Sequence, residues 1–151
     1  MSYSFEITRT FSAPRELVYE AWTTPEHFAV WFGTSAIDVP LDTLSMDVRV
    51  GGVWTAVMNL PDGNQMNWTG EYVEVDPPAQ VAFTITDQPQ DPARALVTVI
   101  LEPVVSDSGD AATAMTMTQS GDEMAEEQQA ATVVGYNAFF DDIERIVAKL
   151  V

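Results

Sequence analysis

The sequence predicts an α+β fold in which an antiparallel sheet packs against one long C-terminal helix. Three observations support this fold class: a strand pattern at residues 3–11, a run of about five or six strands over residues 36–119, and a helical apolar stripe that continues to residue 151. Consecutive strands joined by short turns indicate an antiparallel meander. No repeat or linker interrupts residues 1–151, so we expect a single domain.

Two short helices should follow the first strand. Residues 3–11 alternate between apolar and polar side chains, which is typical of a half-buried strand. Pro14 suits the first turn of a helix, and Thr24 followed by Pro25 is a second start signal. Gly33 suits the end of that second helix. The prolines therefore predict two helices separated by an enforced break.

The sequence pattern predicts strands in the central part of the chain. Gly51 and Gly52, within the first of these strands, suggest a bulge or a sharp bend. Asp62 and Gly63 form a hairpin turn signal. The expected strands are 49–60, 65–75, 80–86, 95–102 and 113–119.

The last segment predicts the longest helix. Ser120 and Glu123 match a capping box, and Asp141 and Arg145 have the spacing of an ion pair on the polar side. A helix of this kind must bury its aromatic stripe, and only the concave face of the sheet is large enough to receive it. The stripe consists of Val133, Tyr136, Phe140, Ile143, Val147 and Leu150.

Composition excludes several classes of function. The chain carries 23 Asp and Glu against 6 Lys and Arg, a net charge of −17, so nucleic acid and anionic membranes are poor partners. This acidity fits either a solvated surface or a docking surface for a basic partner. No apolar run is long enough for membrane insertion. The opening MSYSFEITRT has no signal-peptide pattern, so the expected location is the cytoplasm.

Four sequence blocks resemble one known family. They are RTFSAPRELVYEAWTTPEHFAVWFG, DVRVGGVW, GEYVEVDPPAQVAFT and GYNAFFDDIERI, in this order and spacing. The chain resembles the family related to the C-terminal domain of the activator of heat shock protein 90 ATPase, within the START/SRPBCC superfamily of helix-grip folds. The family often has Gly-Trp where this chain has Gly135-Tyr136, which changes the shape and polarity of the expected pocket.

The resemblance implies a curved antiparallel sheet of about six strands wrapped around the C-terminal helix, with the two short helices closing one end. Such proteins often hold an apolar cavity between sheet and helix. Members of the superfamily include ligand carriers, relatives of aromatases and cyclases, and co-chaperone domains. Fold alone does not select among these activities.

Few residues offer catalytic or metal chemistry. His27 is the only histidine and there is no cysteine, so we expect no metal, no cofactor and no defined catalytic residue. Glu74 shares a strand face with aromatic side chains; it is either an acid of raised pKa or, as we prefer, an exposed residue at the strand end. Arg49 and Arg94 either pair with surface acids or receive an anionic ligand group.

Large aromatic and methionine side chains are the better candidates for a site. They suit a filled core, and they equally suit an apolar pocket with a few polar groups. The candidate ligand-binding residues are Trp31, Trp54, Met58, Trp68, Tyr72, Phe83, Met115, Met117, Tyr136 and Phe140.

Three functions compete at this point. The first is binding of a small hydrophobic or amphipathic molecule, such as a lipid or an aromatic polyketide-like compound, by a carrier or sensor. The second is a cyclase- or dehydratase-like enzyme that uses the same pocket, and the sparse acid–base groups count against it. The third is a chaperone-interacting module, as the family name suggests. The sequence leaves open whether the protein is a monomer or a homodimer.

Overall fold

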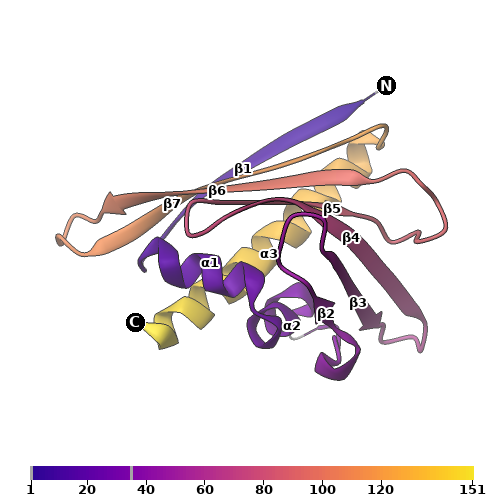
Figure 1. Cartoon of the computed structure of the whole chain (residues 1–151), viewed down its shortest axis with the longest axis horizontal. Coiled ribbons are helices and arrows are strands. Elements are labelled where there is room, and N and C mark those ends of the chain that lie inside the picture. Colours follow the sequence, from indigo (N-terminus) through magenta and orange to yellow (C-terminus); the bar gives the residue numbers. More distant parts are fainter. Residues whose placement is uncertain (1, 35) are drawn as a thin grey trace.

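The computed structural model describes residues 2–34 and 36–151 and is drawn in Figure 1. The chain begins with a strand, continues through two short helices and a series of strands, and ends in a long helix. The elements are β1 (Tyr3–Phe11), α1 (Arg15–Thr23), α2 (Pro25–Gly33), the 3₁₀ helix η1 (Leu41–Thr43), β2 (Ser45–Met46), β3 (Val53–Asn59), β4 (Gln65–Asp76), β5 (Gln80–Ile85), β6 (Ala95–Val105), β7 (Ala111–Gly121) and α3 (Glu126–Leu150).

The strands of the described residues form one antiparallel sheet in the order β1-β7-β6-β5-β4-β3-β2. From β2 to β7 every strand pairs with its neighbour in sequence, which confirms the predicted meander. β1 closes the other edge by pairing along its full length with β7. The seventh strand, beyond the expected six, is the two-residue β2, which extends the edge next to β3.

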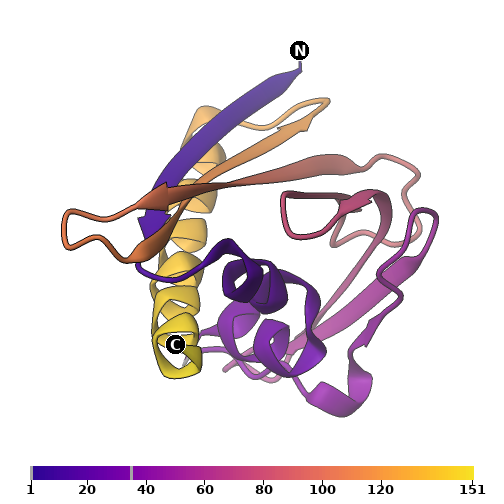
Figure 2. The ribbon, with the colours of Figure 1, turned by 60° about the vertical axis from the view of Figure 1, so that its left-hand side comes forward.

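All three α-helices lie on the same face of the sheet, and Figure 2 shows the twisted sheet passing over them. The buried side of α3 carries Tyr136, Phe140, Ile143 and Val147, four residues of the expected stripe. The sequence therefore predicted the α+β helix-grip arrangement correctly. In the described part of the chain, neither α3 nor any other helix is both long and apolar enough to cross a membrane.

The break between α1 and α2 is confirmed at Thr24. This residue is extended, with φ −104° and ψ 124°, and separates the end of α1 from Pro25 at the start of α2. The backbone N–H of Thr24 donates to the carbonyl of Glu20, and the carbonyl of Thr24 accepts a hydrogen bond from the N–H of Phe28. Thr24 therefore completes the last turn of α1 and begins the first turn of α2. α2 ends at Gly33, as the sequence predicts.

Two local predictions are wrong. Ser120 does not cap α3: it lies in β7, opposite Ser4 on one side and Leu96 on the other, and the helix starts later, after Ala125. The strand expected over 49–60 begins only at Val53, because Gly51, with a φ of 85°, turns the chain before it.

The expected pair of Asp141 and Arg145 is also wrong. Asp141 instead accepts a 2.7 Å hydrogen bond from Arg9 in β1, and Arg145 pairs with Asp142. Arg9 reaches Asp141 because β1 crosses over α3 at this point, and only tertiary structure creates that proximity. Leu150, expected to complete the apolar stripe, is 39% exposed at the end of the helix.

Gly70 allows β4 to approach β5 closely. The indole N–H of Trp54 donates to the carbonyl oxygen of Thr84 at 3.0 Å, directly beside the Cα of Gly70. A methyl group on Gly70 would overlap both the Thr84 oxygen and the Trp54 nitrogen. A side chain at this position is therefore incompatible with the observed backbone. Gly135 in α3 is different, since a methyl group there would meet no atom within 4 Å.

We expect Gly70→Ala to lower the free energy of unfolding by about 3 kcal/mol, because backbone and indole must both move. Gly135→Ala is the matched control and should raise it by about 0.5–1 kcal/mol through helix propensity. Urea denaturation of both variants measures the difference. Equal effects of the two substitutions would contradict the close approach at Gly70.

Candidate functional site

A cavity of about 390 Å³ lies between the sheet and the N-terminal half of α3. Its walls come from segments far apart in the sequence: the start of β1, β3, β4, the end of β5, the end of β7, and α3. The apolar part of the lining includes Phe32, Met58, Trp68, Ile85 and Phe139. No single segment forms the site, so its position depends on how α3 crosses the sheet.

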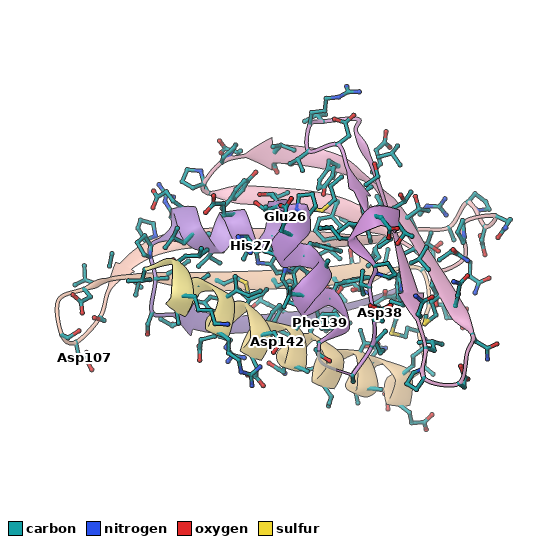
Figure 3. The ribbon with its side chains drawn as sticks, turned by 90° about the horizontal axis from the view of Figure 1, so that it is seen from below. Glu26, His27, Asp38, Asp107, Phe139 and Asp142 are labelled. Carbon is teal, nitrogen blue, oxygen red and sulfur yellow. The ribbon has the colours of Figure 1, made fainter. Side chains whose placement is uncertain are left out.

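The two short helices determine where the cavity ends. Phe139 of α3 packs against Trp31 and Phe32 of α2, with ring centroids 5.5 and 5.6 Å apart. Figure 3 labels Phe139 on α3 at this contact with α2. Beyond it, toward the C-terminus of α3, the buried side chains of α1 and α2 fill the space. The cavity therefore occupies the half of α3 that the short helices leave uncovered.

A chain of hydrogen bonds crosses the cavity wall. The hydroxyl of Tyr136 donates to Oε1 of Gln119 at 2.5 Å, and Nε2 of Gln119 donates to the hydroxyl of Tyr3 at 2.9 Å. Gln119 is only 5% exposed, although it is polar and lies on the same face of β7 as Met115 and Met117. The two tyrosines fix its amide, so a buried polar group is held in one orientation on an otherwise apolar surface.

Burial keeps Tyr136 protonated. Desolvation raises the pKa of its hydroxyl well above the ordinary value of 10.0, and the neighbouring Tyr3 adds to the rise. Tyr136 is therefore a neutral hydrogen-bonding group at physiological pH. Burial also raises the pKa of Tyr72, with smaller contributions from Tyr19 and Asp47, and that of Tyr19, which Asp76 raises further.

Trp68 brings a second polar group to the cavity. Its indole nitrogen is buried and has no hydrogen-bond partner among the described residues. The indole nitrogens of Trp31 and Trp54, by contrast, donate to backbone carbonyls at 2.7 and 3.0 Å. A buried indole N–H usually has a partner, so Trp68 is a cavity-lining residue with an unused donor.

Charged groups lie at the rim of the cavity rather than inside it. Asp87, Asp122 and Glu123 contribute to its lining, and all three are exposed. Arg94 also lies there, where its guanidinium donates to the backbone carbonyls of Asp91, Ala93 and Pro89. The sequence predicted an acid partner or an anionic ligand for Arg94, whereas its hydrogen bonds go to the carbonyls of its own loop.

The structure separates the ten candidate residues into two groups. Met58, Trp68 and Tyr136 line the cavity. The others belong to the hydrophobic core and are not part of its lining: Trp31, Trp54, Tyr72, Phe83, Met115, Met117 and Phe140. The strand and helix patterns identified buried residues but could not distinguish a filled part of the core from the wall of a cavity.

Sequence reasoning missed several lining residues. Gln119 was detectable, because it is a polar residue in phase with Met115 and Met117 on the buried face of a strand. Phe139 lies beside the main stripe of α3, where it widens the apolar face. Tyr3 carried no signal, because only the folding of distant segments brings it to α3.

The remaining candidates lie outside the cavity. Glu74 is exposed and accepts a hydrogen bond from Gln80 at 2.7 Å, as expected for a residue at a strand end. His27 lies next to Glu26 at the start of α2 (Figure 3). Arg49 pairs with Asp47 at 2.9 Å. Within the described residues, no group of three or more His, Asp or Glu side chains could hold a metal ion.

Comparison with known proteins gives the family. Residues 12–148 match the sequence profile of the family described as Activator of Hsp90 ATPase homolog 1-like protein. The chain belongs to this family. A search of functionally curated proteins found no match. Family membership agrees with the observed fold, and it leaves the activity to be argued from the site.

Solved structures of similar fold cover almost the whole chain. A protein from Chromobacterium violaceum is 23% identical with a TM-score of 0.79, and the match covers 95% of this chain and 96% of that one. A protein of unknown function from Staphylococcus aureus is 20% identical with a TM-score of 0.77, covering 99% and 95%. A protein from Staphylococcus epidermidis is 23% identical with a TM-score of 0.78, covering 98% and 91%. At these identities the likeness concerns the fold.

The raised pKa of Tyr136 predicts a loss of stability at alkaline pH. The unfolded chain ionises this tyrosine near its ordinary pKa of 10.0, whereas the folded chain keeps the proton, so the free energy of unfolding falls as pH rises above about 10. Below pH 10 Tyr136 does not contribute to the pH dependence of the free energy of unfolding. Tyr136→Phe should reduce the slope above pH 10 by up to about 1.4 kcal/mol per pH unit.

At neutral pH the same variant should be less stable by about 1 kcal/mol, because Oε1 of Gln119 loses its donor. Urea denaturation at a series of pH values gives both quantities. A variant with the alkaline slope of the wild type would show that Tyr136 ionises normally in the folded protein.

Proposed function

We propose that this protein binds a small hydrophobic or amphipathic molecule in the cavity between α3 and the sheet. The observation that carries the proposal is the cavity itself, with its apolar walls and its few fixed polar groups. Ligand pockets typically have volumes of about 300–1,000 Å³. At about 390 Å³ the cavity is near the lower end, which favours a compact molecule of one to three rings over a long-chain lipid.

The arrangement of acids favours a carrier or sensor over an enzyme. General acid–base catalysis needs a titratable group inside the site with a pKa near the working pH. The carboxylates of the cavity are at its exposed rim, and Tyr136, the buried titratable group, is held neutral. We therefore propose a cytoplasmic binding protein. A cyclase- or dehydratase-like activity and a chaperone-interacting role are the alternatives that the experiment must separate from it.

The proposal predicts that filling the cavity abolishes binding. Gly135 lines the cavity, and a Cβ atom added there meets no atom from another segment of the described chain within 4 Å, so Gly135→Leu should extend into the space without unfolding α3. Ala138→Leu, at an exposed position of the same helix, is the matched control. Binding is measured with phenylnaphthylamine, a neutral probe whose fluorescence rises in apolar surroundings. We expect Gly135→Leu to weaken it at least tenfold and Ala138→Leu to leave it unchanged.

Native mass spectrometry of the freshly purified protein, before and after organic extraction, tests for a natural ligand. Recovery of an unaltered bound molecule supports a carrier, and its conversion during incubation indicates an enzyme. Probe binding that is equal in both variants would remove the cavity as the site. An effect on the ATPase of a cytosolic chaperone that persists in Gly135→Leu would favour the chaperone-interacting role.

A further inference from the structure

We propose that the cavity selects a neutral aromatic molecule that carries an oxygen acceptor, such as a ketone, over the corresponding hydrocarbon and the corresponding carboxylate. This inference names the ligand class of the proposed binding function and rests on it. It follows from three properties of the wall: unused hydrogen-bond donors, aromatic surfaces, and negative charge at the rim. Each property comes from different residues.

The hydrogen-bond chain at Gln119 leaves donors free. The Tyr136 proton is used on Oε1 of Gln119, and one of the two N–H groups of Gln119 is used on the Tyr3 oxygen. The second N–H of Gln119 and the hydroxyl proton of Tyr3 have no acceptor among the described residues. The Gln119–Tyr3 pair therefore keeps two hydrogen-bond donors for a carbonyl or ether oxygen.

Trp68 adds a donor from another strand. Its buried indole N–H is without a hydrogen-bond partner in the described chain, and the ring stands edge-to-face to Phe32, with centroids 5.5 Å apart. Trp68 belongs to β4 and Gln119 to β7, with β5 and β6 between them. Unpaired donors thus belong to cavity-lining residues of two separate strands, and the proposal requires a ligand oxygen to pair with one of them.

Aromatic side chains supply the apolar part of the wall. Phe139 lies between Phe32 and Tyr136, with centroids 5.6 and 5.8 Å away, and Phe32 continues the row to Trp68. All four residues line the cavity. Aromatic rings in offset or edge-to-face contact favour a flat aromatic ligand beyond the area that it buries.

The rim disfavours an anion. Asp87, Asp122 and Glu123 place three acids there against the single guanidinium of Arg94, which already donates to backbone carbonyls. The whole chain carries a net charge of −17. A carboxylate would enter through a net negative field, because three carboxylates outnumber the guanidinium of Arg94 in the described lining, and it would lose part of its hydration. A neutral oxygen acceptor avoids this penalty and still satisfies the donors.

Three probes that share one ring system test this selectivity: acetylnaphthalene, ethylnaphthalene and naphthoate. Affinities are measured by competition with phenylnaphthylamine. We expect the ketone to bind about tenfold more tightly than the hydrocarbon, because it gains one hydrogen bond to a buried donor. The carboxylate should bind weakest. Equal affinities for ketone and hydrocarbon, or tighter binding of the carboxylate, would overturn the inference.

Two variants identify the donor. Trp68→Phe removes the indole N–H and keeps an aromatic ring, and Gln119→Met removes the amide at similar size. One of them should reduce the ketone-to-hydrocarbon affinity ratio to about one, while the affinity for ethylnaphthalene stays within about twofold. A merely structural role would weaken both probes together. If both variants keep the wild-type ratio, neither residue is the donor and the inference is wrong.

Nuclear magnetic resonance gives an independent readout. The indole N–H of Trp68 or the amide protons of Gln119 should shift with acetylnaphthalene and respond less to ethylnaphthalene. Trp22 is an internal control, because its buried indole N–H is also unpaired in the described chain but lies in the core outside the cavity.

The outcomes for the two proposals are distinct. Binding of all three probes without preference, with loss in Gly135→Leu, overturns the ligand class and keeps the binding function. Failure of all probes, including phenylnaphthylamine, overturns both. Preference for the ketone that survives in Gly135→Leu places selective binding elsewhere on the molecule and also overturns the assignment to this cavity.

Discussion

Trp31 is at the centre of an aromatic cluster that joins all three helices. Its indole N–H donates to the carbonyl of Ala21 at the end of α1, at 2.7 Å, and its ring meets those of Trp22 and Phe28 at 4.9 and 4.6 Å. On the other side it contacts Phe139 of α3. This cluster fixes α1 and α2 against one part of α3. It therefore determines where the space between α3 and the sheet is filled by core side chains and where the cavity lies.

The lengths of the helices explain the hollow part. α3 has 25 residues and is about 37 Å long, whereas α1 and α2 have nine residues each and span about 13 Å each. The short helices cannot fill the space under the whole of α3, so its N-terminal half lies over the sheet with a cavity beneath it. Empty space in a core is destabilising. The hydrogen bonds through Gln119 hold β7 to α3 at the cavity, and the ion pair of Arg9 with Asp141 holds β1 to α3 farther along the helix.

The polar groups of the cavity come from individual side chains, whereas the comparisons concern the fold. The family match and the solved structures of 20–23% identity establish the sheet, the helices and their order. Tyr136 supplies the hydroxyl that orients Gln119. Selectivity for a ligand acceptor would therefore depend on side chains of this sequence rather than on the common fold.

The sequence by itself determined the order of the elements, the break at Thr24 and Pro25, and the buried stripe of α3, because periodicity and proline act locally. Met58, Trp68 and Tyr136 were named from the same patterns. Only the tertiary structure decided that these three line a cavity while Trp54 and Phe83 fill the core, because both groups present the same alternation. The hydrogen bonds that connect Tyr3, Gln119 and Tyr136 also depend on tertiary structure. β1 pairs with β7 across more than a hundred residues of chain, and no local sequence pattern encodes that contact.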